Sequence, residues 1–129
     1  MRLIEKNEYF VISVDTSIHR VYLTYTDIPA PNKEAIKDLT PGIRKAAELA
    51  GEGFTGIVDR RLCGPQPPDV SEEILKAHAV AIELGISKMA VLMPYTFISQ
   101  ATAQEMYGKS KIQKKEFSEL LAAEAWLNE

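Results

Sequence analysis

The sequence has 129 residues with a formal net charge of −3, and 46% of its residues are apolar and 26% are charged. These values predict one globular domain spanning 1–129, long enough to bury a hydrophobic core, and they exclude a disordered or fibrous chain. Because Cys63 is the only cysteine, an intrachain disulfide and a cysteine-rich zinc site are also excluded.

Charge and hydropathy predict a cytoplasmic protein that binds no nucleic acid. The longest apolar run, Met89 to Tyr95, is too short to span a bilayer, and the charged residues between Arg2 and Glu8 interrupt any secretory signal. The pI near 5.5 argues against a nucleic-acid footprint, which is normally basic. The lysine-rich stretch 109–115 lacks the interleaved aromatic residues of a single-strand platform, and we expect a solvated edge segment there.

Two alternating segments at the start of the chain predict an antiparallel hairpin. Residues 9–15 and 19–26 alternate in the way strands do, are rich in β-branched and aromatic residues, and are separated by a polar turn at Asp15-Thr16-Ser17. The stretch 2–6 is compatible with one more short strand before the hairpin. Prolines at positions 29 and 31 then end the strand pattern, since proline cannot donate to a ladder.

The remaining chain alternates between helical and extended patterns. A helix is expected after Thr40-Pro41, a typical N-cap and N1 pair, and it should end near Gly51. Short apolar strands are expected at 54–58 and 88–93, with a Pro-rich loop and a helix from about 70 to 85 between them. A helix at 97–107, a basic linker that leaves room for one more strand, and a last helix capped by Ser118 complete the chain.

This order of elements predicts an α/β sandwich. Its mixed sheet begins with the N-terminal antiparallel hairpin, is parallel in its core, and has helices packed on it. As the last helix docks, we expect four of the apolar residues around it to cover the core: Phe117, Leu121, Trp126 and Leu127.

The sequence lacks the specific motifs of nucleotide-binding, hydrolase and zinc-protease sites, so we expect no cofactor and no metal ion. Cys63 lies near Arg60 and Arg61, a setting that favours a thiolate, but no base can be assigned to it and an inert loop cysteine is the better interpretation. His78 lies on an apolar helical face. A buried histidine held by one hydrogen bond is a better interpretation there than a proton shuttle working with Asp59.

The loops after the two central strands are the predicted binding site, because ligands of open α/β sheets collect outside the carboxyl ends of the strands. Arg60 and Arg61 follow the first strand, and Tyr95 and Phe97 follow the second. Arginine offers planar donors suited to carboxylate or phosphate, and aromatic side chains supply contact area. Since consecutive parallel strands deliver their loops to one edge of the sheet, we expect these four residues to form the rim of a ligand or partner site.

Three segments carry a resemblance to a known family. They are the ending Phe117-Ser118-Glu119-Leu120-Leu121-Ala122-Ala123-Glu124-Ala125-Trp126-Leu127, which follows the pattern F-S-x-x-x-x-A-x-x-W-L, the stretch 54–59 and the stretch 88–92. These segments resemble the closing helix and central strands of stand-alone STAS-like proteins, the SpoIIAA-like relatives of sulfate-transporter and anti-sigma-factor-antagonist domains. The resemblance covers nearly the whole chain and implies a STAS-like (SpoIIAA-like) fold.

For the regulatory members, the resemblance implies a phosphorylatable serine in an Asp-Ser-Ser/Thr-Gly turn after the central strand. Here Asp59 is followed by Arg60-Arg61-Leu62-Cys63-Gly64 instead. Ser71, which also fits an ordinary N-cap, is the phosphorylation candidate that remains. Other relatives, akin to lipid-binding domains, imply binding of a small molecule or a membrane surface.

We therefore expect a non-enzymatic regulatory or ligand-binding module, because no nucleophile, base and oxyanion set can be assembled. Its partner would be a protein or a small anionic or amphipathic ligand, and the lysines of 109–115 would add attraction to an anionic membrane surface if they lie on the same side. A small enzyme using Asp59, His78 or Cys63 at the same edge is the alternative. The ligand, the pathway and the oligomeric state, a homodimer included, stay open.

Overall fold

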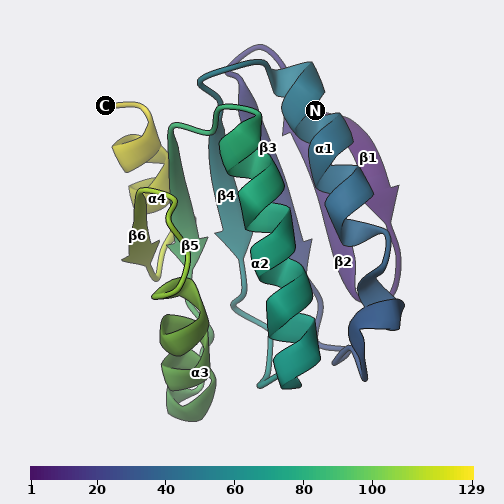
Figure 1. The fold of residues 1–129 in the computed structure, drawn as a ribbon. Coiled ribbons are helices and arrows are strands. Elements are labelled where there is room, and N and C mark those ends of the chain that lie inside the picture. Colours follow the sequence, from purple (N-terminus) through teal and green to yellow (C-terminus); the bar gives the residue numbers. More distant parts are fainter.

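The computed structural model, which describes residues 1–129, has one six-stranded sheet with the strands in chain order (Figure 1). The strands are β1 (Arg2–Lys6), β2 (Phe10–Asp15), β3 (Arg20–Tyr25), β4 (Thr55–Asp59), β5 (Lys88–Leu92) and β6 (Lys114–Phe117). The first three are antiparallel, and β3 through β6 run parallel to one another. The predicted hairpin and the mixed α/β sheet are thus confirmed.

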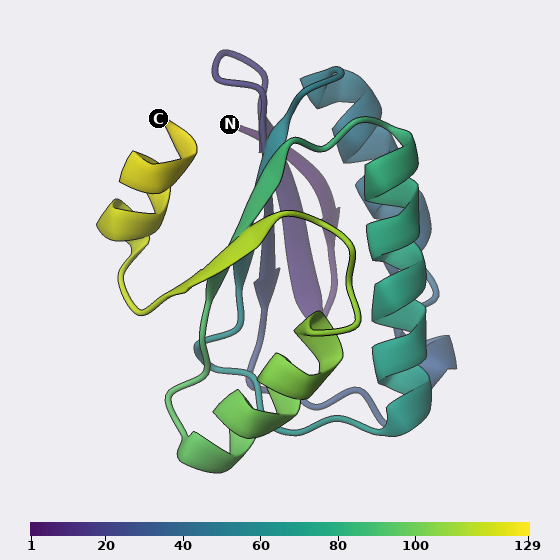
Figure 2. The same cartoon turned by 60° about the vertical axis from the view of Figure 1, so that its left-hand side comes forward.

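Helices lie on both faces of this sheet and at one of its ends. They are the short 3-10 helix η1 (Lys33–Ile36) and the α-helices α1 (Leu39–Ala50), α2 (Pro68–Glu83), α3 (Phe97–Tyr107) and α4 (Leu120–Leu127). Figure 2 shows α1 and α2 on one face, α4 on the opposite face, and α3 near the lower end of the sheet. None of these helices combines the length and the apolar character needed to cross a bilayer.

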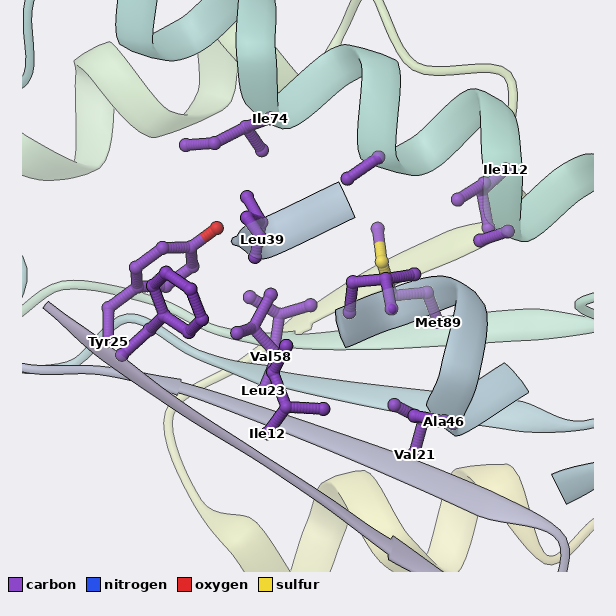
Figure 3. Close-up of a cluster of buried hydrophobic side chains, with 14 of the residues drawn as sticks. Ile12, Val21, Leu23, Tyr25, Leu39, Ala46, Val58, Ile74, Met89 and Ile112 are labelled. Carbon is purple, nitrogen blue, oxygen red and sulfur yellow. The ribbon is translucent and has the colours of Figure 1, made fainter. Parts of the chain in front are cut away.

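The larger core lies between the sheet and the layer formed by α1 and α2 (Figure 3). The alternation of β2 produces it directly: Phe10, Ile12 and Val14 are completely buried on this side, while the residues between them are only half-buried. From β3, β4 and β5 the same face receives Leu23, Val58 and Val91.

Helix α1 packs closely on β2 because small residues line its inner side. Gly42, Ala46 and Ala50 recur at four-residue intervals and are all buried. A Cβ atom at Gly42 would lie 2.7 Å from Cδ1 of Ile12, closer than real Cβ contacts come. The absence of that atom lets the helix approach the strand.

The smaller cluster lies on the opposite face, under α4. It consists of Ile57, Ala90, Leu92, Ala123 and Leu127. Phe117 and Trp126 pack against it half-buried, with their ring centroids 5.7 Å apart. Leu121, which we expected to cover the core, is 80% exposed, because it lies on the solvent side of α4.

The helix starts differ from those expected at three positions. Helix α1 begins at Leu39, so Thr40 is not its N-cap. Helix α2 begins at Pro68, whose fixed φ suits the first turn, and Ser71 therefore lies inside the helix rather than at its cap. Helix α4 begins at Leu120, so the cap position falls on Glu119 and not on Ser118.

The basic segment before α4 includes the edge strand β6. Lys114 and Lys115 begin this strand, which pairs with β5 on one side only. Lysine on an edge strand discourages pairing with other chains, as we expected for this stretch.

Candidate functional site

The loops that follow β4 and β5 meet at the carboxyl edge of the sheet. The Arg60 backbone N–H donates to the Leu92 carbonyl at 2.9 Å, which extends the ladder by one residue, and the Tyr95 N–H donates to the Arg61 carbonyl at 3.2 Å. The topology therefore brings together the two segments that the sequence singled out. Their side chains, however, lie in two different environments.

Arg60 lies inside the fold, whereas the sequence led us to expect it on an exposed rim. Only 2% of it is exposed. Its guanidinium carbon lies 4.5 Å from the ring centroid of Tyr25 and 5.6 Å from that of Tyr107. Its Nη1 donates to the Tyr107 hydroxyl at 3.4 Å, and its Nη2 contacts Cys63 Sγ at 3.2 Å and donates to Gln66 Oε1. We call Arg60, Tyr25, Tyr107, Cys63 and Gln66 the arginine cluster.

The charge of Arg60 has no anionic partner. An arginine side chain stays protonated in proteins, and buried charges are normally paired. None of the ion pairs in the structure involves Arg60, and its Nε is buried without a hydrogen-bond partner. The hydroxyl of Tyr25 is also buried and unpartnered. The cluster thus contains two unused polar atoms, one of them on a cation that contacts two tyrosine rings but no anion.

Arg20 shows how a buried arginine is satisfied elsewhere in the same protein. It is 3% exposed, close to the value for Arg60. Its Nε donates to Thr55 Oγ1 at 3.0 Å, and its Nη2 donates to Asn128 Oδ1 at 2.8 Å. No buried nitrogen of Arg20 is left without a partner. The unpartnered Nε is therefore a property of the Arg60 site and not of buried arginine in this fold.

Two clefts flank the arginine cluster, and Gln66 lines both of them. The tyrosine cleft lies beside Tyr25, Cys63 and Gln66, has a volume of about 30 Å³ and contains no charged side chain in its lining. The helix groove lies between the start of α2 and α3 and has a volume of about 230 Å³. Its lining includes Glu72, Glu105 and Lys109.

The core itself offers little room for a ligand. A cavity of about 40 Å³ lies among the apolar side chains that face α1 and α2, and Tyr25 and His78 both line it. In Figure 3, Tyr25 stands at one end of this group with its hydroxyl directed toward the helical layer, where Ile74 lies. By comparison, a cavity that holds benzene measures roughly 150 Å³. The apolar chain of a lipid would not fit without repacking.

The outer surface of the same edge carries the other three residues of the predicted rim. Arg61 donates from Nε to Oδ1 of Asp59 at 3.1 Å and from Nη2 to Oδ2 at 2.9 Å, so the charge of Arg61 is already paired. Tyr95 is 69% exposed and Phe97 is 84% exposed. Arg61, Tyr95 and Phe97 therefore lie at the surface, and the aromatic pair is freely accessible.

His78 is a buried histidine with one hydrogen-bond partner, the interpretation that the sequence favoured. Its Nδ1 lies 3.0 Å from Ser110 Oγ, and its ring stacks on Tyr107 with centroids 5.4 Å apart. Burial is the main cause that lowers the pKa of His78 to about 4, and the charges of Arg60 and Lys114 contribute to the same shift. The imidazole is consequently neutral near pH 7.

The side chains of the alternative enzymatic site are not joined to one another. Asp59 is held by Arg61, Cys63 contacts Arg60, and His78 contacts Ser110. No three His, Cys, Asp or Glu side chains come together in a way that could hold a metal ion. Ser71, the phosphorylation candidate, is half-buried in the first turn of α2, and its Oγ accepts a 2.9 Å hydrogen bond from Gln66.

Sequence reasoning missed Tyr25, Gln66 and Tyr107. Tyr25 ends β3, which runs parallel to β4, so both strands end at the same edge of the sheet. That strand order could have placed Tyr25 beside the loop after β4. Gln66 lies between prolines and Tyr107 at the end of α3, and neither position carries a recognisable pattern.

Comparisons with protein-family models, with curated proteins and with solved structures gave no match for this chain.

Proposed function

We propose that this protein is a non-enzymatic binding module that takes a small anionic ligand at the carboxyl edge of β3 and β4. One observation carries the proposal: Arg60 is buried with an unpartnered Nε and without an anion. Burying an unpaired charge is costly, and a bound carboxylate or phosphate would supply the missing counter-charge.

The chemistry of the arginine cluster supports an oxyanion as the ligand. The planar guanidinium presents donors in a fork that matches two oxygens of a carboxylate or phosphate. The hydroxyl of Tyr25, which is buried and free, offers one more donor close to the guanidinium. The uncharged lining of the tyrosine cleft favours an anion that also carries an apolar part, and the cleft volume of about 30 Å³ limits that part to a short chain.

One further observation favours binding over catalysis, and another supports a STAS-like identity. Asp59, His78 and Cys63 are each engaged with a different partner, and no hydrogen bond joins a nucleophile to a base among them. The antiparallel start, the parallel strands that follow and the closing helix α4 agree with the element order of the STAS-like resemblance. A regulatory role would then act through ligand binding at Arg60.

The test is anion binding measured by thermal shift and calorimetry at constant ionic strength. The probes are sodium butyrate, sodium hexanoate and inorganic phosphate. At least one should raise the melting temperature of the wild-type protein and of Arg61→Ala, which removes the neighbouring arginine whose charge is already paired. A ligand at free concentration c that binds only the native state stabilises it by RT ln(1 + c/Kd), so the melting temperature should rise with the concentration of the probe.

The deciding variant is Arg60→Met, which keeps most of the side-chain volume but removes the charge. Binding should be lost in it, and Arg60→Lys, which keeps the charge without the fork, should bind with reduced affinity. If Arg60→Met binds the probes as well as the wild type does, or if Arg61→Ala is the variant that loses binding, the proposed site is wrong.

A further inference from the structure

The side chain of Gln66 occupies the place beside Arg60 where an anion would bind. Its Oε1 accepts a hydrogen bond from Nη2 of Arg60. Its Nε2 donates to Ser71 Oγ at 2.9 Å and lies 3.1 Å from Met106 Sδ. An amide oxygen carries only a partial charge, so Gln66 satisfies one donor of the guanidinium without neutralising it.

The backbone around Gln66 does not hold it in place. Neither its N–H nor its carbonyl takes part in a backbone hydrogen bond. Proline flanks it on both sides, in the run Gly64-Pro65-Gln66-Pro67-Pro68. The prolines fix their own φ angles, but they leave the side chain of Gln66 anchored only by its contacts with Arg60, Ser71 and Met106. Those contacts can be exchanged for a ligand without breaking any secondary structure.

We propose that Gln66 is a displaceable gate whose Oε1 stands in for an oxygen of the ligand. This inference rests on the proposed function, because it assumes that Arg60 binds an anion. Gln66 lines both the tyrosine cleft and the helix groove, so its movement opens a path to the guanidinium from either side. A carboxylate that replaces it gains a full charge pair with Arg60.

The charges around the two clefts indicate the route and the class of ligand. Glu72, Glu105 and Lys109 line the helix groove and form no ion pair, so the lining carries two negative charges against one positive charge and disfavours an approaching anion. The tyrosine cleft has no charged lining and is bordered by apolar residues such as Ile28, Ile36 and Val70. The tyrosine cleft is therefore the route for a monocarboxylate. Its volume of about 30 Å³ limits the ligand to a short apolar body, which enters only once the side chain of Gln66 moves aside.

The gate is tested with two substitutions that have opposite expected effects. Gln66→Ala removes the competing oxygen and should tighten butyrate binding by about tenfold, the value of one hydrogen bond to a charged group. Gln66→Glu places a carboxylate beside Arg60 and should raise the melting temperature while weakening butyrate binding at least about tenfold. Butyramide, which has the shape of butyrate without its charge, should bind none of the proteins.

Gln113→Glu is the matched control. Gln113 is exposed and makes no side-chain hydrogen bond, so this variant adds the same charge away from the cluster and should bind butyrate as the wild type does. Weaker binding in Gln66→Ala would show that Gln66 contacts the ligand instead of competing with it, which overturns the gate. Unchanged binding in Gln66→Glu would overturn it too. Loss of binding in Arg60→Met alone would then leave the proposed function standing, whereas no binding of any anion by the wild type would overturn both.

Discussion

Lys88 of β5 contacts Trp126 of the last helix and so links that helix to the sheet. From the start of β5 its Nζ donates to the Trp126 carbonyl at 2.6 Å and lies 4.7 Å from the centroid of the indole ring. A cation close to the C-terminal carbonyls of a helix is favourable because those carbonyls carry partial negative charge. Together with the smaller cluster beneath α4, this contact explains why so short a helix is held in place.

The first prediction concerns this docking. Leu127→Ala should lower the free energy of unfolding by about 3 kcal/mol, because Leu127 is buried in the smaller cluster. Trp126→Ala should cost about 2 kcal/mol, less than for a core tryptophan, since the ring is half-buried. Leu121→Ala should change stability by less than about 0.5 kcal/mol. Urea unfolding measures all three, and a loss at Leu121 equal to that at Leu127 would refute this placement of α4.

The second prediction separates two tyrosines of the arginine cluster. Tyr25→Phe removes a buried hydroxyl that has no partner, so the protein should be as stable as the wild type or more stable by up to about 1 kcal/mol. Tyr107→Phe removes an acceptor of Arg60 and should cost about 1 kcal/mol. The same Tyr25→Phe protein should bind butyrate more weakly. If the Tyr25 hydroxyl lowers stability yet strengthens butyrate binding, it belongs to a functional site. Equal losses of stability in Tyr25→Phe and Tyr107→Phe would argue against this assignment.

The third prediction follows from the lowered pKa of His78, about 4 in the folded protein against 6.5 for the free side chain. Between these values the unfolded chain binds a proton that the native state does not, so stability falls as the pH falls from 6.5 toward 4. Relative to His78→Phe, which keeps a ring against Tyr107, the wild type should lose about 2 kcal/mol between pH 7 and pH 5. Urea unfolding of both proteins at pH 7, 6 and 5 measures the difference, and parallel pH profiles would contradict it.

The hydrophobic pattern predicted most of the fold. The alternation in 9–15 and 19–26 indicates the hairpin because one face of each strand is buried, and β2 shows that burial residue by residue. The strand β6 was harder to predict, since Lys114-Lys115-Glu116-Phe117 has no apolar alternation and is extended only because β5 supplies its hydrogen bonds. Helix starts were misplaced for a related reason: Pro68 and the tertiary packing determine them more than a suitable serine does.

The candidate site was predictable to the level of its loops but not of its side chains. Topology alone brings the segments after β4 and β5 together. Which arginine points inward depends on the strand alternation continuing past Asp59: Val58 faces the larger core, and Arg60, two residues later, lies on that same side. Arg61 then falls on the side of Asp59 and pairs with it. The place of Gln66 depends on how the proline-rich loop folds back, which no local pattern encodes.

The attachment of α4 to the sheet also affects the order in which parts of the protein fold and unfold. Its polar contacts with β3 join residues far apart in the sequence: Arg20 with Asn128 across 108 positions and Tyr22 with Glu124 across 102. Contacts of such separation form late in folding, because the chain entropy of closing the loop must first be offset by the sheet between them. We therefore expect helix α4 to detach first, in a partial opening that uncovers the smaller cluster and leaves the larger core intact. Substitutions in α4 should then act on the rate of unfolding, with folding rates nearly unchanged.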